Sequence, residues 1–151
     1  MKKICFVGGG NMASAMLAGL IKKHPKLACH IIEPFAPARE KLSTLNVVVH
    51  EAANRAAIDG ADAVVLAVKP QVLKEVCSEL LPHLRGELIV SIAAGTRAGT
   101  IARWLGGHTR IVRTMPNTPA LIGQGITGLY AAPTLAADDV ATATELMRST
   151  G

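Results

Sequence analysis

Residues 4–13 read Ile4-Cys5-Phe6-Val7-Gly8-Gly9-Gly10-Asn11-Met12-Ala13, an apolar strand that enters three glycines and then a helix-like stretch. They match G-x-G-x-x-G/A, in which the first glycine makes a tight turn and the second lets the backbone approach a pyrophosphate. The third small residue keeps the helix close to the strand. The free N–H groups and positive dipole end of the helix would then face the phosphates. Because strand, glycines and helix come in the required order, the stretch predicts a dinucleotide-binding loop.

Length and composition indicate one α/β domain. The chain has 151 residues, of which 50% are hydrophobic and only 3% aromatic, so the core must consist of Ala, Val, Leu and Ile. Such a core suits parallel strands covered by helices. The expected strands and helices alternate, which predicts a Rossmann-like, doubly wound, mainly parallel sheet with helices on both faces.

The expected elements follow hydrophobic periodicity and the positions of Gly and Pro. After the first strand, extended segments are expected at Ala28–Glu33, Asn46–His50, Asp62–Lys69, Leu88–Ile92, Arg110–Thr114 and Ile126–Ala132. Helices are expected at Asn11–Lys23, Ala38–Leu45, Asn54–Gly60, Val72–Leu84, Gly99–Leu105 and Leu135–Met147, and a proline-broken loop at Met115–Pro119.

Charge and residue spacing argue against several function classes. The net charge is +5, but Lys and Arg are scattered and aromatic residues are scarce, so we expect a small anionic ligand and no nucleic acid. The longest apolar run, Ala63–Val68, is far shorter than the roughly 20 residues that span a bilayer, so no membrane partner is expected and the predicted location is cytoplasmic. Cys5, Cys29 and Cys77 are expected to be buried apolar residues, and neither they nor the histidines have metal-ligand spacing. No hydrolase or kinase motif is present, so a cofactor must carry the reaction.

The carboxyl ends of the strands predict the binding site, because ligands of doubly wound sheets lie beyond them. Lys69 ends the most apolar strand and is positioned to meet a phosphate or a ribose, unless it is only a solvated charge. Asn117, between two prolines, could orient a polar ligand, unless it only caps a turn. The candidate ends are Gly8–Met12, Glu33-Pro34, Ala67-Val68-Lys69-Pro70, Ala93-Ala94-Gly95-Thr96 and Met115-Pro116-Asn117-Thr118-Pro119.

Glu33 bears on the choice of cofactor. It follows Gly10 by 23 residues, where an acidic residue binds the ribose 2′-hydroxyl of NAD and would repel the 2′-phosphate of NADP. Arg39, at the start of the next expected helix, is the candidate cation for such a phosphate. The loop alone favours NAD, and the sequence leaves the choice between NAD and NADP open.

Four ordered motifs carry a family resemblance: Phe6-Val7-Gly8-Gly9-Gly10-Asn11-Met12, Ala67-Val68-Lys69-Pro70, Val90-Ser91-Ile92-Ala93-Ala94-Gly95 and Arg113-Thr114-Met115-Pro116-Asn117-Thr118-Pro119. Together they resemble Δ1-pyrroline-5-carboxylate reductase, the last enzyme of proline biosynthesis, over essentially the whole chain. The resemblance implies reduction of the cyclic imine Δ1-pyrroline-5-carboxylate to L-proline by hydride from NAD(P)H.

The resemblance also assigns residues. It implies cofactor contacts at Gly8, Gly9, Gly10, Asn11, Met12, Asn54, Ala67, Val68, Lys69 and Pro70, and it places Ala93, Ala94 and Gly95 by the nicotinamide. It places Met115, Pro116 and Asn117 beside the reacting face. No residue of 1–151 is a candidate general acid, and an imine that arrives protonated needs none.

Enzymes of this family continue into a helical domain that dimerises and completes the substrate pocket. Residues 1–151 are therefore expected to be the NAD(P)-binding domain alone, poorly active by itself, of an enzyme that forms a homodimer or higher oligomer through the domain that this chain lacks. Two alternatives stay open. One is a non-catalytic NAD(P)-binding module that regulates a partner, and the other is a reductase of a related imine or β-hydroxyacid.

Overall fold

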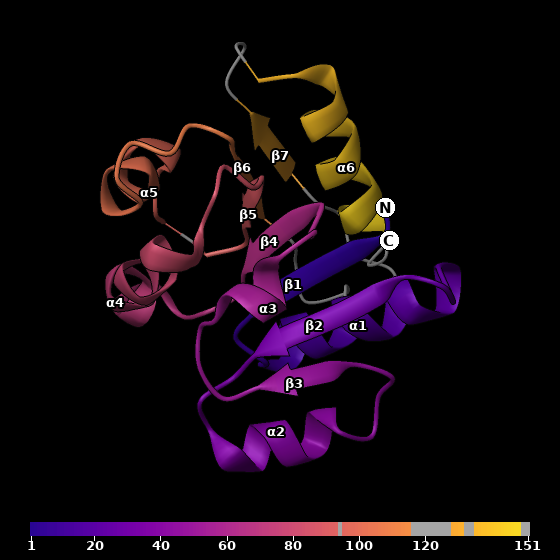
Figure 1. The fold of residues 1–151 in the computed structure, drawn as a ribbon. Helices are drawn as coiled ribbons and strands as arrows, with labels where there is room; N and C mark the ends of the chain where they lie inside the picture. The colour runs from indigo at the N-terminus through magenta and orange to yellow at the C-terminus, as the bar shows by residue number, and fades with distance from the viewer. Residues whose placement is uncertain (94, 116–127, 132–134, 149–151) are drawn as a thin grey trace.

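A seven-stranded sheet of order β3-β2-β1-β4-β5-β6-β7 forms the centre of the computed structural model, which describes residues 1–93, 95–115, 128–131 and 135–148 (Figure 1). The first six strands are parallel, and β7 runs antiparallel to β6. The predicted doubly wound, mainly parallel sheet is confirmed. The strands are β1 (Lys3–Val7), β2 (Ala28–Ile32), β3 (Val48–His50), β4 (Ala63–Leu66), β5 (Ile89–Ser91), β6 (Ile111–Met115) and β7 (Gly128–Ala131).

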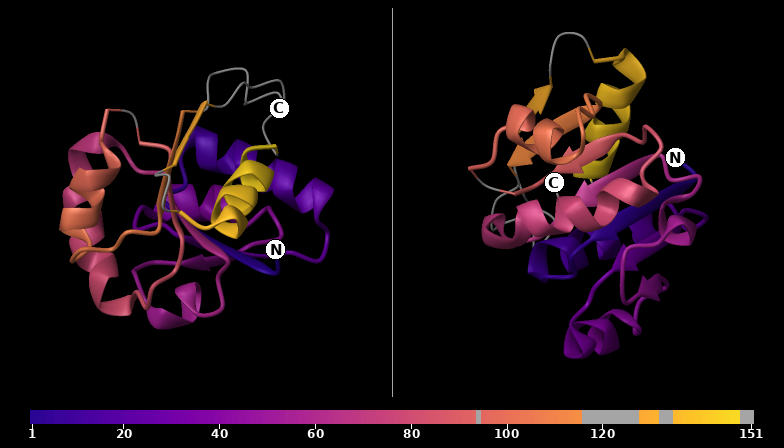
Figure 2. Two further views of the ribbon diagram at one scale, coloured as in Figure 1. Left: turned by 90° about the horizontal axis from the view of Figure 1, so that it is seen from above. Right: turned by 60° about the vertical axis from the view of Figure 1, so that its left-hand side comes forward.

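Helices cover both faces of the sheet, as Figure 2 shows from above, with α4 and α5 on one side and α1 and α6 on the other. On β1, Ile4 and Phe6 pack with α1, α2 and α6, whereas Cys5 and Val7 pack with α3, α4 and α5. Strands that are buried on both faces are apolar throughout rather than alternating. The helices are α1 (Asn11–Lys23), α2 (Ala36–Leu42), α3 (Arg55–Ile58), α4 (Pro70–Leu80), the 3₁₀ helix η1 (Leu81–His83), α5 (Ala98–Trp104) and α6 (Ala137–Met147).

Most element boundaries differ by a few residues from the sequence-based expectation, and β4 ends at Leu66 and not at Lys69. Two further differences lie near the candidate site. Helix α4 begins at Pro70 and not at Val72, because proline is favoured in the first turn of a helix, where its missing N–H has no partner to lose. Strand β6 extends to Met115, which was expected to begin a loop, because Met115 pairs with Gly128 of β7. Both shifts lie at the edge of the sheet where the strands end.

The three cysteines Cys5, Cys29 and Cys77 are buried and free, as expected. Burial raises the pKa of the Cys5 thiol to about 12 and that of Cys77 to about 11. No helix in the described part of the chain has both the length and the apolar character needed to cross a membrane. The described residues also include no group of three or more His, Cys, Asp or Glu that could hold a metal ion.

Candidate functional site

Gly8 makes the tight turn between β1 and α1. Its φ is +97°, a conformation that L side chains rarely adopt. A Cβ at Gly8 would lie 2.8 Å from the carbonyl oxygen of Ala67 and 2.8 Å from Cγ1 of Val68. The Gly8 N–H donates to the carbonyl of Ile32 at 2.9 Å. The turn is therefore fixed between the ends of β2 and β4, which confirms the conformation predicted for Gly8.

Gly10, at the start of α1, faces open space. It is the N-cap residue, with an ordinary φ of −71°, and a Cβ placed there would meet nothing within 4 Å. No described part of the protein therefore requires a glycine at this position. The first N–H groups of a helix have no partners within it, so those of α1 are available to a ligand. Gly10 leaves room for an anionic group to approach them.

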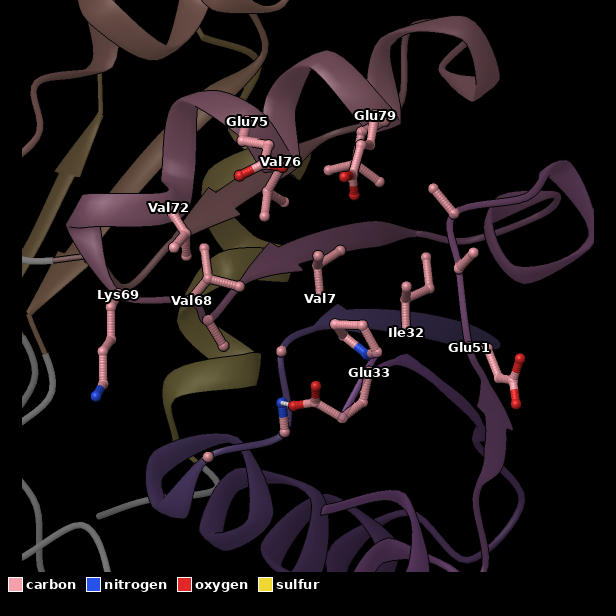
Figure 3. Close-up of a pocket in the computed structure, with 18 residues that line it drawn as sticks. Val7, Ile32, Glu33, Glu51, Val68, Lys69, Val72, Glu75, Val76 and Glu79 are labelled. Atoms are coloured by element: carbon pink, nitrogen blue, oxygen red, sulfur yellow. Dashed lines mark hydrogen bonds between the residues drawn. The ribbon is translucent and has the colours of Figure 1, made fainter. Parts of the chain in front are cut away.

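A cavity of about 850 Å³ extends from this loop over the ends of β1, β2 and β4 (Figure 3). In Figure 3, Val72 and Val76 point from α4 toward Val68 and Val7, so the middle of the cavity is apolar. Glutamates lie around this apolar part. The lining residues are Val7, Gly8, Gly9, Gly10, Ile32, Glu33, Pro34, Glu51, Ala52, Ala53, Ala67, Val68, Lys69, Val72, Glu75, Val76, Glu79 and Leu80.

Glu33 joins two loops of the site through its carboxylate. Its Oε1 accepts a hydrogen bond from the Gly9 N–H at 2.9 Å, drawn as a dashed line in Figure 3. Its Oε2 accepts one from the Phe35 N–H at 3.0 Å. The carboxylate therefore has a fixed position between the glycine loop and the turn that leads into α2.

A second cavity of about 280 Å³ borders the start of α1 and the residues that follow β4 and β5. The two cavities share Gly10, Ala67, Val68 and Lys69. An elongated ligand can therefore lie in both and cross between them at Gly10, beside the exposed Lys69. The lining residues of the second cavity are Gly10, Asn11, Met12, Ala13, Ala67, Val68, Lys69, Pro70, Ile92 and Ala93.

Most of the described candidate residues are brought together in these two cavities. Asn54 is not among the described residues that line either one, because its side chain is the N-cap of α3 and accepts from the Ala57 N–H at 2.8 Å. Gly95 is exposed, with φ +76°, and is also outside both linings. Met115 ends β6, whereas Ala94, Pro116 and Asn117 lie outside the described residues.

The face of α4 that closes the larger cavity was not among the residues predicted from the sequence. Val72, Glu75, Val76 and Glu79 are three or four residues apart and therefore share one side of the helix. The sequence contained a signal, because the helix has two apolar sets at helical spacing, Val72 with Val76 and Leu73 with Cys77 and Leu80. The second set packs on the sheet, and Val72 is 44% exposed. An amphipathic helix with an additional apolar pair on its exposed side indicates a ligand surface.

Two histidines and Asn54 form a hydrogen-bonded row beside the site. His30 Nδ1 lies 2.9 Å from His50 Nε2, and Asn54 Nδ2 lies 3.2 Å from His50 Nδ1. The Asn54 amide nitrogen is a donor, so His50 accepts at Nδ1 and donates from Nε2 to His30. This assignment requires both rings to be neutral. Burial, and then the positive charge of Lys3, lower the pKa of His30 and of His50.

The histidine row predicts a loss of stability in mild acid. The unfolded chain takes up protons as the pH falls through about 6.5, whereas the folded chain takes them up only at lower pH, so the free energy of unfolding decreases from about pH 7.5 to 5.5. Urea unfolding at the two pH values measures this decrease. It should be smaller in His50→Gln and unchanged in the control His83→Gln, which keeps the row intact. Equal pH dependence in the wild type and in His50→Gln would contradict the assignment.

Comparison with known proteins identifies the family. Residues 3–95, which include the glycine loop, Glu33 and the Ala67–Lys69 segment, match the family described as NADP oxidoreductase coenzyme F420-dependent. The chain belongs to this family. The match covers five of the six parallel strands and every described residue that lines the larger cavity.

Several pyrroline-5-carboxylate reductases are similar to this chain over nearly its whole length. That of Pseudomonas aeruginosa is 41% identical over 151 residues, which are 99% of this chain and 55% of the relative. A solved structure of a pyrroline-5-carboxylate reductase from Coxiella burnetii has a TM-score of 0.90 and 38% identity over 98% of this chain and 56% of that one. The chain thus spans about half the length of the curated relatives it matches.

A third relative was solved with a ligand. The pyrroline carboxylate reductase of Plasmodium falciparum, with NADP bound, has a TM-score of 0.82 and 28% identity over 99% of this chain and 55% of that one. The fold that contains the two cavities is therefore shared with a protein that binds a nicotinamide dinucleotide.

Proposed function

We propose that this chain is the cofactor-binding part of an oxidoreductase that reduces Δ1-pyrroline-5-carboxylate to L-proline with NAD(P)H. The observation that carries the proposal is the glycine loop. Gly8 fixes a turn that only glycine adopts easily, and Gly10 opens the start of α1 between two cavities. The similarity to pyrroline-5-carboxylate reductases along the whole chain supports the choice of substrate.

The described residues fit a nicotinamide dinucleotide. The larger cavity has an apolar middle for an adenine, with Glu33 available to ribose hydroxyls. The helix start at Gly10–Met12 and the ammonium of Lys69 suit the pyrophosphate. Ala67, Val68, Pro70 and Ala93 give the second cavity a lining of small or apolar side chains, which allows a flat ring to approach closely. When bound, the reduced cofactor supplies a hydride for the imine carbon.

We propose no catalytic residue in this chain. Its residues bind and orient the cofactor, and positioning is the protein's main contribution to such a reaction. The imine can arrive protonated, in which case it needs no general acid. We propose that Asn54, Ala94 and Gly95 also contact the cofactor, and that Met115, Pro116 and Asn117 lie beside the reacting face.

We further propose that the other half of the relatives' length corresponds to a helical domain that completes the substrate pocket and forms a homodimer or higher oligomer. The 151-residue chain would then bind the cofactor but turn over poorly, since one wall of the pocket would be absent. The free, buried cysteines support a cytoplasmic location, because reduced thiols are typical of that compartment.

The proposal can be tested with the chain and with a chimera. We expect the chain to bind NADH or NADPH in calorimetric titration and to oxidise it only slowly when pyrroline-5-carboxylate is added. Residues 1–151 fused to the remaining part of the Pseudomonas aeruginosa relative should oxidise the cofactor rapidly, and only with this substrate. A chain that binds neither cofactor would overturn the proposal. Binding without turnover in the chimera would favour the regulatory module, and turnover with a different imine or β-hydroxyacid would favour a related reductase.

Lys69 should strengthen cofactor binding by its charge. Replacing it with Ala is expected to raise the Kd of the cofactor about tenfold, as for loss of one charge-assisted contact. The difference should shrink as salt rises from about 0.05 to about 0.5 M, because salt screens exposed charges. Lys74→Ala is the matched control, since Lys74 is exposed on α4, the helix that Lys69 precedes, but lines neither cavity. An equal effect of both variants would contradict a specific role for Lys69.

A further inference from the structure

We propose that the larger cavity selects NADH over NADPH, with Glu33 as the residue that determines the preference. This inference rests on the proposed function, because it assumes that the chain binds a nicotinamide dinucleotide in this cavity. The two cofactors differ by one 2′-phosphate on the adenosine ribose, which adds about two negative charges at neutral pH. Selectivity therefore depends on the charges that surround the ribose.

The carboxylate of Glu33 is held in place by the main chain. It accepts from the Gly9 N–H at 2.9 Å and from the Phe35 N–H at 3.0 Å, one bond to each oxygen. A carboxylate has about four acceptor positions, so it can also accept a hydrogen bond from a ribose hydroxyl. It cannot move away from a phosphate without losing both backbone bonds. A fixed negative charge that accepts hydrogen bonds favours the 2′-hydroxyl and repels the 2′-phosphate.

The other carboxylates that line the cavity also disfavour a 2′-phosphate. Glu51, Glu75 and Glu79 also line it, and Lys69 is the only Lys or Arg among its described lining residues. Figure 3 shows Lys69 and Glu51 at opposite ends of the cavity, with Glu33 between them near the glycine loop. A phosphate near Glu33 would therefore lie in a cavity lined by four carboxylates, while the lysine lies at one end of the cavity.

The arginine of α2 is already bound to other groups. Arg39 Nη1 donates to the carbonyl oxygens of Glu33 at 3.1 Å and of Pro34 at 2.6 Å. Its Nη2 lies 3.3 Å from Glu51 Oε1, and its side chain is only 23% exposed. To bind a 2′-phosphate, the guanidinium would have to leave these partners. Arg39 instead stabilises the turn after β2, and its ion pair is with Glu51 rather than with the carboxylate of Glu33.

The experiment compares the affinity of the chain for paired ligands by calorimetric titration. We expect the Kd of NADPH to exceed that of NADH by about tenfold or more, since a like-charge contact is strongly unfavourable. The pair 2′,5′-ADP and ADP should show the same order without any nicotinamide. Glu33→Gln keeps the shape of the side chain and removes its charge, and it should reduce both ratios to about threefold or less. Glu40→Gln removes one charge on α2 outside the cavity and should leave both ratios unchanged.

The outcomes separate the two proposals. If the wild-type chain binds NADPH as tightly as NADH, the selectivity proposal is wrong while cofactor binding stands. If it binds neither, the proposed function fails and the selectivity proposal fails with it. A preference for NADH that persists in a folded Glu33→Gln variant would show that another residue selects the cofactor. If that variant does not fold, the Kd values of ADP and 2′,5′-ADP for the wild type, with and without high salt, still test the repulsion, which salt should weaken.

Discussion

Replacing Gly8 with Ala should lower the free energy of unfolding by about 3 kcal/mol and abolish cofactor binding. The backbone at Gly8 has φ +97°, which is unfavourable for any residue with a Cβ. The new methyl group would also lie 2.8 Å from the Ala67 carbonyl oxygen, a main-chain atom that can move only if the end of β4 moves with it. Urea unfolding and calorimetric titration of the variant measure the two effects.

A second glycine provides the control for backbone strain alone. Gly60 also has a positive φ, +75°, but a Cβ there would meet nothing within 4 Å. Gly60→Ala should therefore lower the free energy of unfolding by only about 1 kcal/mol. If Gly8→Ala were no more destabilising than Gly60→Ala, the close contact with β4 would not be what requires a glycine at position 8.

Replacing Gly10 with Val should separate the two effects, with a large loss of binding and little loss of stability. A side chain at Gly10 would extend into open space above the start of α1, so the folded protein can accept it. The N-cap preference for glycine over valine limits the loss of stability to about 1 kcal/mol. The side chain would block the approach of the pyrophosphate to the helix N–H groups, and loss of two charge-assisted hydrogen bonds corresponds to about a 100-fold rise in Kd.

A smaller ligand, adenosine, provides the control for indirect effects of Gly10→Val on the shape of the cavity. The proposed position of adenosine in the larger cavity does not extend past Gly10, so its affinity should change by less than about threefold in Gly10→Val. The affinity of the dinucleotide should fall much more. An equal loss for both ligands would indicate that the variant disturbs the whole cavity, and the crossing point assigned to Gly10 would then be incorrect.

The fold could be predicted because the sequence patterns that indicate each strand or helix lie within that element. The Ala63–Val68 run marked a strand buried on both faces, and it became β4 at the centre of the sheet. Helical layers on both faces then follow from the right-handed connection of parallel strands, whereas the strand order was not predicted. Helix ends were less predictable, since Pro70 is compatible both with the end of a strand and with the first turn of a helix.

The candidate site was predictable where residues follow a strand directly, as Gly8, Glu33 and Ala67 do. It was not predictable where tertiary contacts decide what a side chain does. The N-cap role of Asn54 and its bond to His50 depend on how α3 packs beside β3. The part of α4 that faces the cavity depends on which of its two apolar stripes packs on the sheet.

The bond from Glu33 to the Gly9 amide also bears on how such a protein could change its coenzyme during evolution or by design. Exchanging Glu33 for a cationic residue would remove an acceptor from the glycine loop as well as a charge from the ribose subsite. A first substitution toward NADPH use would therefore loosen the turn that every dinucleotide needs. A switch of coenzyme in this scaffold should thus require at least one compensating change in the loop, and single substitutions should lose affinity for NADH before they gain affinity for NADPH.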